Sequence, residues 1–379
     1  MQLKSLVTLS VVLSSLSFSG LVSAAPQQTT GTTTTSAATG AILTGVATTD
    51  ATTTAPTSTA TDSSSLTTTA DTTTTTSSDT GNSTSSGNSN SSGNSTSSSN
   101  STSSGSHFVI YSDSWVTGGA PEASQIEGYN AFLLSFLLSD KSSDQAQNWE
   151  TLDDATRKKV KEAYSQAGIK LMVSAFGGTS TPTTSGDDAK AVAEKMADWV
   201  IKYDLDGIDV DYEDTTAMNA KDGKAEEWVI TFTKALREKL PQGKYTLTHA
   251  PMAPWFSDKT YTSGAYMKIH KEVGSMIDWY NIQFYNQGDY EDCDSLITKS
   301  KGTPGTSLLE IAAAGVDMNK LVVGKPADTK AASNGYIAPA DLSKCLAQAK
   351  EKGWSAGAMV WEYPAADSKW IKDARGSVF

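Results

Sequence analysis

Residues 204–214 read DLDGIDVDYED, and this stretch decides how the rest of the chain is interpreted. Six of its eleven residues are carboxylates, yet Ile208, Val210 and Tyr212 give its centre the pattern of a buried strand. Burying an unpaired carboxylate costs several kcal/mol. Folding alone does not account for such a cost, so the stretch indicates a site where carboxylates carry out chemistry.

Side chains alternate between the two faces of a strand, which puts Asp209, Asp211 and Glu213 on one face. If that face points inward, three carboxylates stack toward the end of the strand, where a substrate would bind. Asp206 has the opposite parity, and we expect it to bind backbone groups near the strand's start. The alternatives are a calcium loop or a solvated acidic surface, but the run lacks the ligand spacing of an EF-hand loop.

Seven further strand-like runs accompany this one between His107 and Phe379. Their continuous hydrophobicity is typical of parallel strands covered on both faces, and amphipathic helical stripes separate several of them. The pattern predicts a TIM (β/α)8 barrel over residues 107–379, with its chemistry at the carboxyl ends of the strands. The first connection is rich in Gly and Pro, so its helix should be short or missing. The eight runs are 108–112, 131–138, 169–176, 205–212, 245–251, 279–286, 320–326 and 357–363.

The first 106 residues differ in composition from the rest. Residues 1–24 predict a secretory signal peptide, with Lys4 before an apolar run and a small-residue cleavage site at residues 22–24. A membrane anchor is the alternative, but the segment is rich in Ser and short for a span. Residues 25–106 are rich in Ser and Thr and lack aromatic residues, which predicts a disordered, glycosylated stalk. N-glycosylation sequons occur there at Asn82, Asn90, Asn94 and Asn100.

Charge and motif content exclude several classes of function. The net charge of −12 is not that of a nucleic-acid-binding protein. The three histidines have no metal-binding spacing, and neither a phosphate-binding glycine loop nor a Gly-x-Ser-x-Gly elbow occurs. We therefore expect no metal, cofactor, nucleic acid or membrane partner, and a monomer secreted to the medium or cell wall.

Residues 206–213, DGIDVDYE, resemble the Asp-x-x-Asp-x-Asp-x-Glu signature of glycoside hydrolase family 18, the chitinases and endo-β-N-acetylglucosaminidases. Four more segments resemble the family in the right order. The third-strand segment contains Gly177 and Gly178, although Ala175 stands where the family usually has Ser. The short stretch before the last strand implies a compact fungal-like chitinase without the family's α+β insertion. The four segments are VSAFGGTS (173–180), THAPMAPW (248–255), IQFYN (282–286) and GAMVWEYP (357–364).

The resemblance implies a mechanism in which the acetamido oxygen of the substrate replaces a second carboxylate and the product keeps its β configuration. Glu213 would be the general acid and then the base. Asp211 would accept the acetamido N–H, and Tyr285 would donate to its carbonyl oxygen. Asp209 and Asp211, as like charges, should raise the pKa of Glu213. Trp361 would form the apolar floor beneath the sugar.

Other residues on the resembling segments are expected to bind substrate. For the aromatic residues Trp115, Trp255 and Phe256, stacking on sugar rings and packing in the core both remain open, and Gln283 and Met252 are similarly open. The expected substrate-binding residues beside Trp361 are Gln283, Asn286, Gly177, Gly178, Met252 and Trp255.

Two cysteines, Cys293 and Cys345, occur in a chain that is expected to be secreted. Pairing would join the loop after the sixth strand to the helix before the eighth. Two buried free thiols are the alternative, and we expect the disulfide.

These features predict a secreted chitinase-like hydrolase whose substrates are chitin or N-acetylglucosamine oligosaccharides. An endo-β-N-acetylglucosaminidase acting on N-glycans would use the same residues. A chitin-oligosaccharide-binding protein with little activity is a different class, but such proteins commonly lose the acid, which is present here as Glu213. A structural wall glycoprotein would explain the stalk but not the acidic strand.

Overall fold

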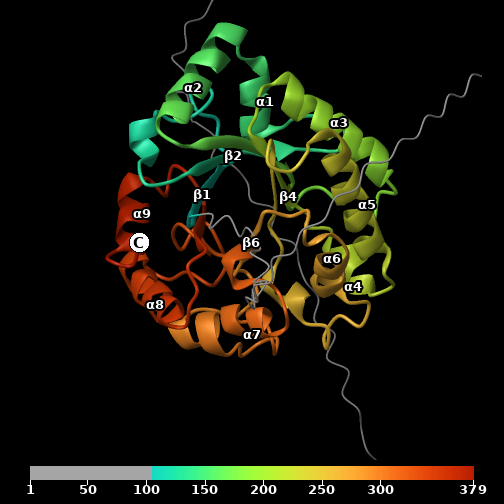
Figure 1. Ribbon diagram of the computed structural model, residues 1–379, viewed down its shortest axis with the longest axis vertical. Helices are drawn as coiled ribbons and strands as arrows, with labels where there is room; N and C mark the ends of the chain where they lie inside the picture. The colour runs from blue at the N-terminus through green and yellow to red at the C-terminus, as the bar shows by residue number, and fades with distance from the viewer. Residues whose placement is uncertain (1–104) are drawn as a thin grey trace, which may run out of the picture. The chain divides into compact units, whose positions relative to one another are not determined.

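The computed structural model describes residues 105–379, which form a closed barrel of eight parallel strands surrounded by helices (Figure 1). The strands pair in chain order, and β8 pairs with β1 to close the barrel. This confirms the prediction of a TIM barrel. The predicted signal peptide and stalk lie outside the described residues and remain predictions.

The strands coincide with the eight apolar runs. Their residues are almost all buried, because the barrel interior covers one face and the helices cover the other. The strands are β1 (His107–Ser112), β2 (Ala131–Leu137), β3 (Lys170–Phe176), β4 (Gly207–Asp211), β5 (Thr246–His249), β6 (Trp279–Gln283), β7 (Leu321–Pro326) and β8 (Gly357–Trp361).

The helices pack their apolar stripes against the strands. Val192 and Met196 of α3 are buried, as their spacing predicts, and the Asp188 side chain caps this helix by accepting from the Ala191 N–H. The first connection holds only η1 (Ala123–Ile126), the short element that its Gly and Pro content predicts. The helices are α1 (Asp144–Thr151), α2 (Asp154–Gln166), α3 (Ala189–Lys202), α4 (Thr215–Ala220), α5 (Lys224–Lys239), α6 (Ala265–Val273), α7 (Leu308–Ala313), α8 (Pro339–Glu351) and α9 (Ser368–Arg375). Shorter helical segments are η2 (Ala253–Phe256), η3 (Asp294–Thr298) and η4 (Met318–Lys320).

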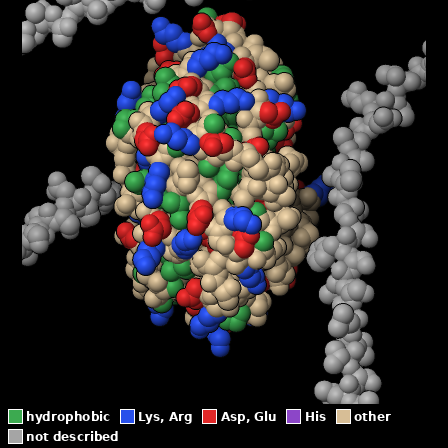
Figure 2. Space-filling view, turned by 90° about the vertical axis from the view of Figure 1, so that its right-hand side faces the viewer, with side chains coloured by type: hydrophobic (Ala, Val, Ile, Leu, Met, Phe, Trp, Pro, Cys, Tyr) green, Lys and Arg blue, Asp and Glu red, His purple; other side chains and the backbone are tan. Residues whose placement is uncertain are grey.

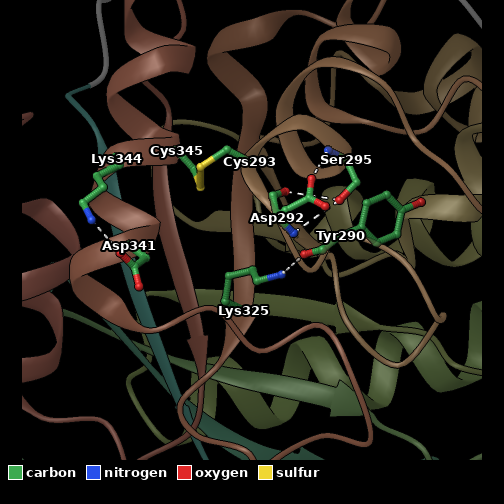
Figure 3. The surroundings of a disulfide bond; sticks show 8 residues. All are labelled: Tyr290, Asp292, Cys293, Ser295, Lys325, Asp341, Lys344 and Cys345. Atoms are coloured by element: carbon green, nitrogen blue, oxygen red, sulfur yellow. Dashed lines mark hydrogen bonds and ion pairs between the residues drawn. A yellow bond between two sulfur atoms is a disulfide. The ribbon is translucent and has the colours of Figure 1, made fainter.

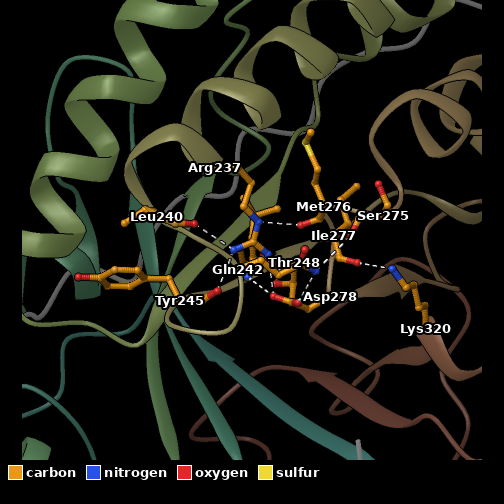
Figure 4. A network of polar contacts seen from close by, with 12 residues as sticks. Arg237, Leu240, Gln242, Tyr245, Thr248, Ser275, Met276, Ile277, Asp278 and Lys320 are labelled. Atoms are coloured by element: carbon orange, nitrogen blue, oxygen red, sulfur yellow. Dashed lines mark hydrogen bonds and ion pairs between the residues drawn. The ribbon is translucent and has the colours of Figure 1, made fainter. Parts of the chain in front are cut away.

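A buried arginine fixes the amino-terminal ends of β5 and β6 (Figure 4). The Arg237 guanidinium donates to the carbonyls of Leu240, Tyr245 and Met276 and pairs with Asp278 at 2.8 Å. Asp278 in turn accepts from the Leu247 N–H at 2.8 Å. The two strands are thereby held in register, which sets the position of their carboxyl ends on the opposite side of the barrel.

Charges of both signs are interspersed on the molecular face drawn in Figure 2. This face therefore offers no continuous basic stripe to a nucleic-acid backbone. Within residues 105–379, no helix combines the length and the apolar character needed to cross a bilayer.

The predicted disulfide is confirmed: Cys293, which precedes η3, is bonded to Cys345 of α8 (Figure 3). Nearby, the buried ammonium of Lys325 on β7 donates to the carbonyls of Phe284 at 2.7 Å and Tyr290 at 2.8 Å. Burial lowers the pKa of Lys325 to about 7. The disulfide and Lys325 together attach the long segment after β6 to β7 and to α8, the helix that follows it.

Removing the disulfide with Cys293→Ser and Cys345→Ser should lower the free energy of unfolding by about 2–4 kcal/mol, because the unfolded chain regains the freedom of a long loop. Denaturant unfolding of wild type and the double variant measures this difference, and reductant should lower the wild-type stability alike. Equal unfolding free energies with and without reductant would contradict a stabilising bond.

Candidate active site

The acidic stretch forms β4, and its alternating parity is as expected. Asp209 and Asp211 point into the barrel interior and are buried, while Glu213 follows the strand and is half-buried. The outward-facing Asp206 accepts from the Leu171 N–H at 2.7 Å and pairs with Lys161 at 2.6 Å. This confirms that Asp206 binds backbone near the strand's start.

Four side chains from four other strands donate hydrogen bonds to Asp209. Burial raises the pKa of Asp209, and these donors oppose that effect by stabilising the ionised form. Both oxygens of the Asp209 carboxylate therefore accept hydrogen bonds inside the barrel. The donors are Tyr111 at 2.8 Å, Ser174 at 2.9 Å, Thr248 at 2.5 Å and Asn281 at 3.1 Å.

The side-chain amide of Gln283, at the end of β6, joins the next two carboxyls. It lies 2.9 Å from Asp211 Oδ1 and 3.0 Å from Glu213 Oε1, and it also approaches the Ala250 carbonyl at 3.0 Å. Asp211 and Glu213 thus share one amide, and the pKa values of both are raised, which favours a proton on the pair.

The pKa values of this pair differ in cause from what the sequence suggests. Burial raises the pKa of Glu213, and the hydrogen bonds from Gln283 and Asp211 oppose the rise. Burial also raises the pKa of Asp211 well above its usual value, and the charges of Glu213 and Asp209 add to it. The expected direction for Glu213 holds, but the like-charge effect acts on Asp211, because Asp211 lies between the other two carboxyls.

Tyr285 and Trp361 lie at the carboxyl ends of β6 and β8. Burial raises the pKa of Tyr285, and the neighbouring charges of Asp211 and Glu213 add to the rise, so its hydroxyl keeps its proton. That hydroxyl makes no hydrogen bond to another residue of the described part. The half-buried Trp361 stacks on Phe136, with ring centroids 5.7 Å apart. A free donor and an aromatic face therefore accompany the acids.

The two glycines after β3 leave room for Phe136 and for Glu213. Gly177 has a left-handed backbone with φ +72°, and a Cβ there would lie 2.8 Å from the Phe136 ring. A Cβ on Gly178 would lie 3.2 Å from Glu213 Oε2. The Gly177 N–H donates to the Asp211 carbonyl at 2.9 Å. A larger residue at either position would press on the site.

The expectation that Trp255 binds substrate is corrected by its burial. Only 1 % of its surface is exposed, and it stacks on Tyr266 with a centroid separation of 6.0 Å, so it offers no face to a sugar ring. Phe256 is buried too, whereas Trp115 is 60 % exposed. The packing alternative therefore holds for Trp255 and Phe256.

The other expected binding residues lie at the rim. Met252 is half-buried beside the Gln283 backbone. Asn286 is exposed, and its side-chain oxygen accepts from the N–H and the hydroxyl of Ser333 at 2.8 and 3.1 Å. This contact ties the end of β6 to the segment after β7, so part of the Asn286 amide is already engaged.

The donors to Asp209 and also Glu362 were not among the residues predicted from the sequence. Each donor is a polar residue at an inward position of an otherwise apolar strand, and this signal could have identified them. Glu362 follows Trp361 and accepts from the Asp113 N–H at 2.7 Å, and burial raises its pKa to about 8. Among residues 105–379, no cluster of three or more His, Cys, Asp or Glu side chains is arranged to hold a metal ion.

Comparison with known proteins agrees with this geometry. Residues 107–371 match the family described as Glycosyl hydrolases family 18. A basic endochitinase of Nicotiana tabacum is 32 % identical over 208 residues, which are 51 % of this chain and 62 % of that protein. This chain therefore spans less than two thirds of the tobacco protein's length. A chitinase of Enterococcus faecalis is 27 % identical over 266 residues, 62 % of this chain and 71 % of the relative.

A solved structure agrees with the sequence matches. The crystal structure of a GH18 chitinase from Pseudoalteromonas aurantia superposes with a TM-score of 0.62 and 26 % identity, covering 72 % of this chain and 100 % of that one. The family match extends over the whole barrel and includes the acidic strand. The chain therefore belongs to glycosyl hydrolases family 18.

Proposed function

We propose that this protein is a chitinase that hydrolyses β-1,4 bonds next to N-acetylglucosamine with retention of the β configuration. The observation that carries the proposal is the buried carboxyl pair of Asp211 and Glu213, bridged by Gln283 beside the free hydroxyl of Tyr285. A hydrolase of this type needs a proton held near the leaving oxygen and a donor for the acetamido group, and these residues supply both.

Glu213 acts as the general acid and then as the base. Its half-buried carboxyl lies past the end of β4, where an incoming glycosidic oxygen can reach it. Burial raises its pKa, which keeps a proton available at a pH where a solvated glutamate has lost it. After the sugar leaves, the same carboxylate takes a proton from the attacking water.

Asp211 and Tyr285 orient the acetamido group that serves as nucleophile. Asp211 accepts the acetamido N–H once its proton has moved toward Glu213, and the Tyr285 hydroxyl donates to the acetamido carbonyl. The oxygen of that carbonyl attacks the anomeric carbon to form an oxazolinium ion, which water then opens. Positioning of this kind accounts for a large share of a reaction barrier. The four donors of Asp209 favour its ionised form, and in that form it stabilises the positive charge that develops on the sugar.

The remaining expected contacts complete the substrate site. Trp361, held by Phe136, forms the apolar floor under the sugar ring. Gly177 leaves space for Phe136 and Gly178 leaves space beside Glu213, and Gln283, Met252 and Asn286 line the edge of the substrate site. Trp115, which is 60 % exposed, is available to a further sugar ring.

The substrates in this proposal are chitin and N-acetylglucosamine oligosaccharides, and the protein acts as a monomer without a cofactor. Its predicted signal peptide and Ser/Thr-rich stalk support secretion to the medium or the cell wall. An endo-β-N-acetylglucosaminidase acting on N-glycans would use the same acid and the same acetamido partners, so it is the second arm of the test below.

Wild-type protein should cleave chitohexaose to shorter oligosaccharides and leave a high-mannose glycoprotein intact. Glu213→Gln should lower turnover by about 10²–10⁴-fold, because the amide has the shape of the acid but delivers no proton. Product analysis by mass spectrometry measures both substrates, and oligosaccharide binding by the variant serves as the control for folding. Release of N-glycans without cleavage of chitohexaose would overturn the chitinase assignment, and near-wild-type turnover of Glu213→Gln would overturn the acid.

Replacing Gln283 with Met should move the alkaline limb of the pH profile of kcat/KM to higher pH. The amide stabilises the ionised carboxyls and so lowers the pKa of Glu213. Without it the pKa rises, and the acid keeps its proton further into the alkaline range. Gln242→Met is the matched control, because Gln242 donates to Asp278 at the opposite end of the barrel. A limb that stays in place or moves to lower pH in the folded Gln283 variant would contradict this assignment.

A further inference from the structure

The two residues that flank Glu213 point away from the barrel interior and bind two consecutive threonines. These threonines belong to the β3–α3 loop, residues 177–188, which begins with the glycines beside the acid. Tyr212 is buried, and its hydroxyl donates to Thr183 Oγ1 at 2.8 Å. The Asp214 carboxylate accepts from the N–H and the hydroxyl of Thr184 at 2.7 and 2.6 Å.

Asp214 is an unusual residue to bury, because it has no cation among its hydrogen-bond partners. Its side chain is fully buried, and its third donor is the Ala217 N–H of α4 at 3.1 Å. A buried carboxylate that relies on neutral donors is costly when one of them is removed. Thr184 supplies two of the three contacts, so the loop and the residue after the acid are held together.

The same loop also touches Glu213 from its other end. Gly178 leaves 3.2 Å between the position of a Cβ and Glu213 Oε2, and the Gly177 N–H binds the Asp211 carbonyl. Further along, the Asp187 carbonyl accepts from the Trp228 indole at 2.7 Å. The β3–α3 loop is thus held near both of its ends, and it forms one wall of the space around Glu213.

We infer that Tyr212 and Asp214 are positioning residues that hold the β3–α3 loop against Glu213 through Thr183 and Thr184, and so keep the acid desolvated and aimed. This inference rests on the proposed function. The other groups that face Glu213 are the carboxyl of Asp211, the hydroxyl of Tyr285 and the amide of Gln283, none of which the loop contacts replace.

Loosening the loop should hydrate Glu213. Because burial is the main cause of its raised pKa, hydration lowers that pKa, and the acid loses its proton at a lower pH. The alkaline limb of kcat/KM therefore moves to lower pH, the opposite direction from that expected for Gln283→Met. A residue that merely stabilised the fold would not shift this limb.

The test uses full-length protein carrying Tyr212→Phe, Thr184→Val or both, with chitotetraose as the substrate. Tyr212→Phe removes a hydroxyl, and Thr184→Val replaces one with a methyl group of similar size. Asp214→Asn completes a double-mutant cycle with Thr184→Val. We expect kcat of the double hydroxyl variant to fall about ten- to hundredfold with KM near the wild-type value, since small misplacements of reacting groups have effects of this size. The alkaline limb should move to lower pH, and Asp214→Asn with Thr184→Val should be less than additive.

Thr233→Val is the matched control, because it also removes a buried hydroxyl, one that contacts Val229 and His249. Its kcat and pH profile should equal those of the wild type. Wild-type kcat and an unmoved limb in the folded Tyr212→Phe and Thr184→Val double variant would overturn the inference. Glu213→Gln distinguishes failure of the positioning role from failure of the proposed function. If Glu213→Gln is inactive while the double variant is normal, only the positioning role fails. If Glu213→Gln is active, the proposed function fails as well.

Discussion

Desolvation of the carboxyls on β4 is the constraint on which the rest of the site depends. Taking Asp209 and Asp211 out of water is unfavourable unless donors replace the lost hydration. The barrel supplies these donors from strands that are far apart in sequence, and Tyr111 and Asn281 both reach Asp209 across the interior. The same exclusion of water raises the pKa values of Asp211 and Glu213, and the proposed mechanism draws on the proton that is retained in this way.

The three inward carboxyls differ in role because their partners differ. Asp209 has donors from four strands, whereas Asp211 shares the Gln283 amide with Glu213. Glu213 alone extends past the strand, where the β3–α3 loop limits its contact with water. In the proposed mechanism, this gradient of burial along one short strand separates a fixed charge, an orienting group and an acid.

Much of the fold and the centre of the site could be predicted from the sequence, because both depend on local periodicity. Continuous apolar runs located the eight strands, and alternation within the acidic stretch assigned Asp209 and Asp211 to the interior and Asp206 to the backbone. The disulfide between Cys293 and Cys345 followed from the chain having only two cysteines.

The rest depends on tertiary contacts that no local pattern encodes. Trp255 is an aromatic residue of the kind that stacks on sugar rings, but packing on Tyr266 leaves it buried. The donors to Asp209 are single polar residues on separate strands, and only closure of the barrel brings them together. The cause of the raised pKa of Glu213 likewise depends on how deeply the loop after β3 buries it, which spacing along the chain does not reveal.

Proton NMR of the first product released from a chitin oligosaccharide tests the assignment of the acetamido group as nucleophile most directly. Two displacements at the anomeric carbon retain configuration, so the β anomer should appear first and then equilibrate with the α anomer in solution. Initial appearance of the α anomer would mean a single displacement by water. The roles given to Asp211 and Tyr285 would then be incorrect, even if Glu213 remained the acid.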